Sequence, residues 1–198
     1  QKKLHTLIRM KISFIPLAAA AFLFTSTVNA AFTIDLTGNN NYDDENPLNI
    51  AFTDGLNSAT ATLIPTGGDF NSNTGDFGIG DDQIDGTSEI VTITFDKAIE
   101  FNFIDFGGVG STISDGAKLT IAGVSTDLFT GVTGFSGSSD KYTPSSPIEI
   151  AIGQSISVTG SSATSSFDIQ TINVSIVPEP NTYALIAGMF ALVSVMFQ

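Results

Sequence analysis

Apolar residues recur at every second position through the middle of this chain, in short runs separated by clusters of Gly, Asn, Asp and Ser. Val91, Ile93 and Phe95, for example, alternate with threonines. This period places alternate side chains on opposite faces of a β-strand, and no segment of the region carries the 3.6-residue period of an amphipathic helix. The pattern therefore predicts an all-β domain over residues 31–176, an antiparallel β-sandwich of the jelly-roll type.

We expect roughly eight to ten short strands in this domain. The clearest predicted strands cover residues 32–36, 59–64, 90–95, 101–106, 117–121, 125–129, 148–152, 155–158 and 167–176. Strict alternation places Phe101 and Phe103 on one face of their strand, and Ile104 and Phe106 on the other. The segments 134–146 and 160–166, rich in Ser, Thr and Gly, are expected to be long exposed loops.

Acidic residues are strongly enriched in the same region. Residues 31–176 contain 19 of the 20 acidic residues and three of the seven basic residues, a formal net charge of −16. Such a surface repels nucleic acid and disfavours direct adsorption to anionic lipid, because binding to phosphates needs clustered Lys and Arg. The charge instead suits divalent cations, cation-bridged polysaccharide or simple solubility.

Residues 1–30 have the features of an export signal peptide. Met10 and a lysine precede a 13-residue apolar run at positions 12–24, and a short polar segment follows. The run is too short to span a bilayer comfortably but suits the middle of a signal peptide. The small residues Val28 and Ala30 predict cleavage after Ala30, and we expect translation to start at Met10.

Val177-Pro178-Glu179-Pro180 separates the β-rich region from an uncharged segment at positions 181–198. The two prolines make a stiff, extended break. As a helix the following segment would be about 27 Å long, close to the ~30 Å thickness of a hydrocarbon core. Because it is apolar on every side, we predict a transmembrane helix rather than a helix buried in the domain.

This motif, the apolar segment and their place at the chain end together resemble the PEP-CTERM sorting signal, over residues 177–198. In that family the tag is recognised by a membrane-embedded transpeptidase, the exosortase, of Gram-negative bacteria that make exopolysaccharide. The resemblance implies that Pro178, Glu179 and Pro180 are the recognised tripeptide, and that the helix holds the precursor in the inner membrane. The family's tag ends in a basic cluster, so we expect the natural chain to continue beyond Gln198.

The densest polar cluster lies at residues 75–89, where glycines are interspersed among acidic residues. Carboxylates of Asp81, Asp82, Asp85 and Glu89 are hard oxygen ligands of the kind that calcium prefers, although their spacing does not match the EF-hand loop. Two interpretations stay open, a weak calcium site and a solvated acidic turn. The candidates for further ligands brought close by folding are Asp43, Asp44 and Asp115.

Residue types that many enzymes use are missing from the predicted domain. The chain has no Cys and no Trp, and its one histidine, His5, lies in the predicted leader. Thiolate nucleophiles, Ser–His triads and His or Cys zinc sites are therefore excluded from the domain, and no Gly-rich phosphate loop is present. Glycoside hydrolysis needs only two carboxylates and stays as a weaker alternative. We expect that the protein is not an enzyme.

These features predict an exported protein, held in the membrane as a precursor and then sorted to the cell envelope, outer surface or exopolysaccharide matrix. Its sandwich is expected to have a structural or adhesive role. The alternative is a calcium-dependent carbohydrate-binding module, which an exposed aromatic at Tyr42, Tyr142 or residues 129–135 would favour. The segment 79–96 is also loosely similar to a stretch of PEP-CTERM passenger domains, a similarity that assigns no reaction.

Overall fold

The computed structural model describes residues 30–37, 42–53, 57–73, 76–81, 83–130, 132–136 and 140–178, together with Met189. The predicted signal peptide before Ala30 and the predicted transmembrane helix lie outside these residues, as do Asp82, Glu179 and Pro180. Among the helices that these ranges contain, none has the length and apolar character needed to cross a bilayer. Between residues 30 and 178 the described helical structure is one 3₁₀ turn, η2 (Ile113–Asp115).

The described chain is all-β, and every strand pair is antiparallel. The first sheet has the order β1-β15-β8-β12-β11, with β13 also paired to β8 and β6 to β15. Its strands are β1 (Ala31–Asp35), β6 (Ile84–Asp85), β8 (Ile99–Gly107), β11 (Phe135–Ser136), β12 (Lys141–Tyr142), β13 (Ile148–Ile150) and β15 (Ser166–Ile176).

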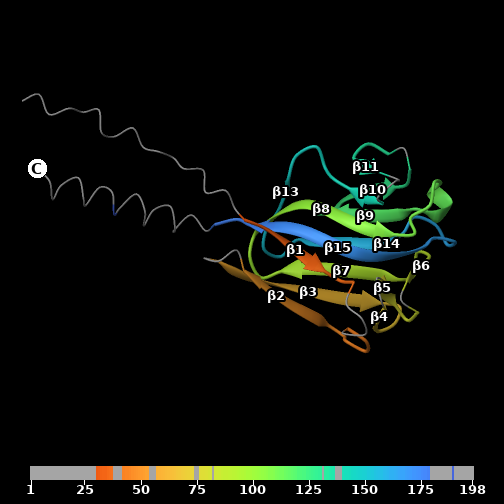
Figure 1. The fold of residues 1–198 in the computed structure, drawn as a ribbon, viewed down its shortest axis with the longest axis horizontal. Coiled ribbons are helices and arrows are strands. Elements are labelled where there is room, and N and C mark those ends of the chain that lie inside the picture. Colours follow the sequence, from red (N-terminus) through yellow and green to blue (C-terminus); the bar gives the residue numbers. More distant parts are fainter. Residues whose placement is uncertain are drawn as a thin grey trace, which may run out of the picture.

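The second sheet has the order β10-β9-β14-β7-β3-β2, and a separate hairpin joins β4 to β5. These strands are β2 (Leu48–Thr53), β3 (Ser58–Thr66), β4 (Phe70–Asn73), β5 (Asp76–Ile79), β7 (Ile90–Phe95), β9 (Ala117–Ile121), β10 (Val124–Leu128) and β14 (Ser155–Gly160). Figure 1 shows the two sheets as layers, an arrangement consistent with the predicted β-sandwich.

One apolar cluster draws on both sheets and is rich in Ile and Phe. Strand β7 illustrates the alternation, because Val91, Ile93 and Phe95 are buried and the residues between them are partly exposed. In β15 the ring of Phe167 is fully buried and meets Phe106 of β8 edge-on, at 5.7 Å between centroids. Burial of such large side chains is the main favourable contribution to folding.

Both ends of the domain leave it on the same side. Ala31 of β1 pairs with Ser175 of β15, so the first strand starts where the last strand ends. We call this end of the molecule the terminal pole (Figure 1). The turns 86–89, 108–116 and 161–165 join strands at the opposite end, which we call the distal pole. Any anchor after Ile176 would therefore hold the distal pole away from the anchoring surface.

Two predictions about strands are wrong. In β8, Phe101, Ile104 and Phe106 are all buried, because a β-bulge at Asn102 breaks the strict alternation. Phe103 instead lies beneath the ammonium group of Lys141, 3.6 Å from its ring centroid. The predicted exposed loop 134–146 contains two short strands, β11 and β12, and the buried ring of Phe135.

Candidate functional site

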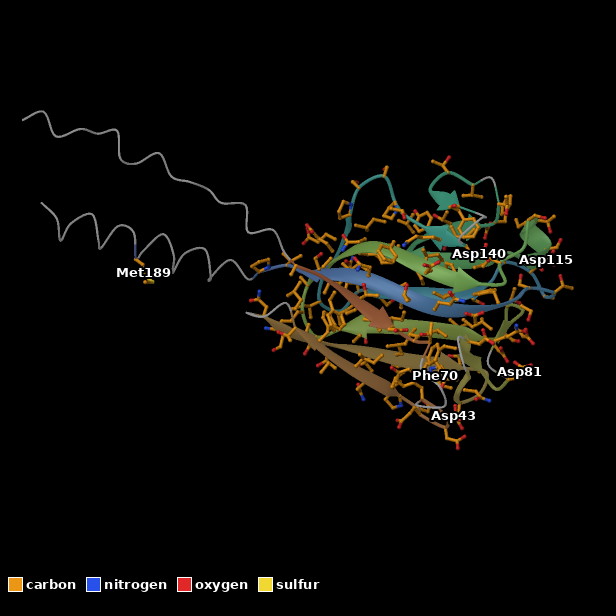
Figure 2. The ribbon with its side chains drawn as sticks, viewed as in Figure 1. Asp43, Phe70, Asp81, Asp115, Asp140 and Met189 are labelled. Carbon is orange, nitrogen blue, oxygen red and sulfur yellow. The ribbon has the colours of Figure 1, made fainter. Side chains whose placement is uncertain are left out.

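The predicted calcium segment lies at the distal pole. Asp81 is exposed in the turn after β5, Asp85 ends β6 and Glu89 directly precedes β7 (Figure 2). The main-chain N–H of Asp85 donates to Glu89 Oε2 at 2.7 Å. Partial burial raises the pKa of Glu89, the hydrogen bond from Asp85 lowers it, and the charges of Asp85 and Asp81 raise it further. Folding thus brings Asp85 and Glu89 together.

A complete set of metal ligands is not formed by these residues alone. Within the described ranges, no three acidic or histidine side chains converge on a point where an ion could bind. Asp82 lies outside those ranges, so the predicted role of this loop in calcium binding stays a prediction. Calcium also accepts main-chain carbonyls and water, so two carboxylates can be enough for a weak site.

A polar groove of about 420 Å³ borders the same loop. Its walls are the turn at residues 85–88 and the segment 163–166, and they present mainly hydroxyl and main-chain groups. The amide of Gly86 donates to Ser165 O at 2.8 Å, which joins one wall to the other. The buried Oδ1 atom of Asp85 has no hydrogen-bond partner. Such a groove offers donors and acceptors to a polyhydroxylated ligand.

Three further carboxylates line a second polar pocket, of about 340 Å³. Asp43, Asp44 and Asp69 share it with Gly80, so Asp43 and Asp44 do come close to the loop, as predicted. Asp43 Oδ1 already accepts a hydrogen bond from the amide of Ser72, and Asp69 Oδ1 accepts one from Asn46. The third predicted partner, Asp115, lies apart from them in η2 (Figure 2).

Among the described carboxyl groups, Asp168 has the pKa that is shifted furthest from its usual value, and the sequence did not single it out. It is only 4% exposed, although it lies in β15 between two apolar residues. The side chain of Gln170 and the amide of Gly107 donate to its carboxyl group, but its buried Oδ1 atom has no partner. Burial, the charge of Asp76 and that of Asp140 raise the pKa of Asp168 to about 7.

Gly107 is needed for this arrangement. It is paired with Asp168 across the first sheet, and a Cβ atom built on it would lie 2.2 Å from Asp168 Oδ2. Any side chain at position 107 would therefore displace the carboxylate. The only sequence signal for this site was one acidic residue in an apolar strand, and its partners come from distant segments.

None of the four aromatic side chains at the predicted positions is fully exposed, since Tyr42, Phe129 and Tyr142 are partly buried and Phe135 is buried. Tyr42 is partly buried edge-on against Phe77, and Phe135 is only 7% exposed. Tyr142 stacks on Phe101 and borders an apolar groove of about 260 Å³ at the edge of the two sheets. The aromatic signal that would favour a carbohydrate-binding module is thus missing from these positions.

The predicted sorting motif begins directly after the last described strand, β15. The amide of Val177 donates to Ala98 O at 2.9 Å, directly after β15, and Pro178 is buried. At the other boundary, Ala30, the predicted signal-cleavage residue, is exposed. No protein-family model, no curated protein and no solved structure matches the chain.

Proposed function

We propose that the chain is an exported cell-surface or exopolysaccharide-matrix protein with a structural or adhesive β-sandwich. Its C-terminal segment is a PEP-CTERM sorting signal, in which Val177, Pro178, Glu179 and Pro180 are presented to an exosortase. The helix that follows holds the precursor in the membrane until it is processed. The mature domain then belongs to the envelope, the outer surface or the surrounding matrix.

The observation that carries this proposal is the position of the two boundaries. The last core strand, β15, ends at Ile176, directly before Val177, so no residue of the motif belongs to a described strand. Ala31 lies beside Ser175, so a signal peptide and a sorting tag would leave from the same pole. A membrane-held precursor could therefore fold fully while both boundaries stay near the membrane-bound processing enzymes.

The strand order supports a jelly-roll interpretation of the sandwich. In an eight-stranded jelly roll lettered B to I along the chain, one sheet has the order B-I-D-G and the other C-H-E-F, which is the product of two Greek keys. Strand β1 corresponds to B, and β7, β8, β9 and β10 correspond to C, D, E and F. Strands β12 and β13 together correspond to G, β14 corresponds to H and β15 to I. The observed sheets then have this order, and β2 and β3 extend the second sheet. The segment 48–85 is accordingly an insertion between the first two strands of the roll.

An adhesive role is supported by the charge of the distal pole. Asp81, Glu89 and Asp115 all lie there, on the side away from the proposed anchor. Carboxylates on an extracellular surface can be bridged by divalent cations to anionic polysaccharide, and they keep the domain soluble. This arrangement requires no enzymatic reaction.

A calcium-dependent carbohydrate-binding module is the second candidate. The polar groove between residues 85–88 and 163–166 favours it, because hydroxyl-rich walls can bond to the hydroxyl groups of a sugar. A carboxylate glycosidase is supported less well. The pKa of Asp168, raised to about 7, would suit a general acid, but at 4% exposure this group has little surface for a substrate.

The sorting proposal is tested by changing Glu179 and Pro180 to alanine in the full chain, expressed in a bacterium that has an exosortase. Pro178 is left unchanged because it is buried in the domain, and its replacement could affect folding. The expected result is uncleaved precursor that accumulates in the inner membrane. The matched control is Asn181→Ala, which changes the next residue outside the tripeptide.

Processing of the control but not of the double variant would support recognition of the tripeptide. Normal processing of the double variant would contradict the proposed role of the motif. Because both substitutions lie outside the core strands, a change in folding is not expected to account for either result.

A further inference from the structure

The carboxylate of Asp168 is buried without full compensation. At 4% exposure it is removed from bulk water, yet its Oδ1 atom accepts no hydrogen bond. Burial of an ionised carboxylate is costly unless a proton, a cation or several hydrogen-bond donors compensate its charge. The two donors at this site, Gly107 and Gln170, leave one oxygen free.

The surroundings of Asp168 add negative charge. Asp140 accepts hydrogen bonds from the amides of Gly108 and Val109, directly after Gly107, and its charge acts on Asp168. The charge of Asp76, in β5, acts on Asp168 more strongly still. Lys141, which follows Asp140 in the chain, pairs with Asp105 instead, at 3.9 Å.

We propose that Asp168 Oδ1 is a ligand of a divalent cation, Ca²⁺, bound between β15, β8 and β5 near the distal pole. Asp76 supplies a second carboxylate, and main-chain carbonyls and water complete the shell. Three convergent acidic side chains are not found among the described residues, so the site has fewer protein charges than a high-affinity calcium loop. This site is separate from the predicted loop at Asp81–Glu89.

Calcium is the divalent ion that fits these donors best. The described part of the domain contains no His or Cys, so all side-chain ligands are hard oxygens, which disfavours zinc and copper. Calcium also accepts irregular geometry and six to eight oxygens, whereas magnesium requires a near-ideal octahedron. With two carboxylates, the expected dissociation constant is on the order of 10⁻⁴–10⁻³ M, as in extracellular modules.

Gly107 is part of the proposed site. Its missing side chain lets Asp168 Oδ2 lie against the main chain of β8, which leaves Oδ1 free for an ion. A bound ion would link Asp168 of β15 to Asp76 of β5, two residues 92 positions apart in the chain. Binding to the folded state alone would therefore stabilise the distal half of the first sheet.

The test uses the full chain, purified in detergent and freed of metal with a chelator. Its melting temperature and calorimetric titration are measured with CaCl₂, for the unchanged protein and for Asp168→Asn. At a calcium concentration of about 100 times the dissociation constant, a rise in Tm of roughly 5–10 °C is expected. Asp168→Asn should lose this rise. Asp127→Asn should keep it, because Asp127 lies on the edge strand β10 and its carboxylate is already paired with Lys118 at 3.8 Å.

Asp85→Asn separates this site from the predicted loop. Loss of the calcium shift in Asp85→Asn but not in Asp168→Asn would overturn the proposal, as would the absence of any shift in the unchanged protein. If Asp168→Asn does not fold, Asp76→Asn takes its place. A reduced calcium shift in Asp76→Asn would then support the proposal, and an unchanged shift would refute it.

Discussion

Replacement of Asp168 by Asn should make the metal-free protein more stable above neutral pH. The pKa of this carboxyl group rises from 3.8 to about 7 on folding, so between these values the folded state binds more protons than the unfolded state. The free energy of unfolding therefore decreases as the pH rises from about 4 to 7, and the decrease due to Asp168 is complete above pH 7. The difference between the two pKa values corresponds to a loss of at most about 4 kcal/mol in the free energy of unfolding.

Asn keeps the size of the side chain and can still accept hydrogen bonds from Gly107 and Gln170, but it cannot ionise. We expect Asp168→Asn to raise the free energy of unfolding by about 1–4 kcal/mol at pH 8 and to change it little at pH 4. Urea unfolding in chelator at several pH values measures both quantities. A variant that is less stable at pH 8, or that keeps the original pH dependence, would refute the argument.

Two further predictions concern packing. Phe167→Ala should lower the free energy of unfolding by about 3–5 kcal/mol, because the ring is fully buried against Phe106. The control Val124→Ala, at a site 72% exposed, should change this free energy by less than about 0.5 kcal/mol. Gly107→Ala should cost about 1–3 kcal/mol, since its Cβ would lie 2.2 Å from Asp168 Oδ2. Adding Asp168→Ala should relieve part of that cost, and independent, additive effects of the two changes would contradict the predicted contact.

The fold class and most strands could be predicted because the two-residue period is a local property of the sequence. Strand β7 lies at the predicted residues 90–95, and the 3₁₀ turn is the one described helical element between residues 30 and 178. Strand β2 was missed although Leu48, Ile50 and Phe52 carry the same alternation. The hairpin of β4 and β5 gave a weaker signal, because it lies in a stretch rich in Asn, Gly and Asp.

Features that depend on distant pairing could not be predicted. The bulge at Asn102 arises from the register of β8 against β15, and it moves Ile104 and Phe106 to the buried face. The environment of Asp168 depends on Gly107 and on Asp76, which the sequence separates by 61 and 92 residues. Local patterns showed the acidic loop at Asp81–Glu89 but carried no information on which carboxylates folding would bury.

The most direct test of the proposed sorting is the intact mass of the mature protein isolated from the envelope or matrix of the bacterium that makes it. The proposal predicts an N-terminus at Ala31 and loss of the apolar segment after Pro180. Termini at these positions would place both processing events at the boundaries of the folded domain. A mature protein that still contains residues 181–198 would contradict the central claim.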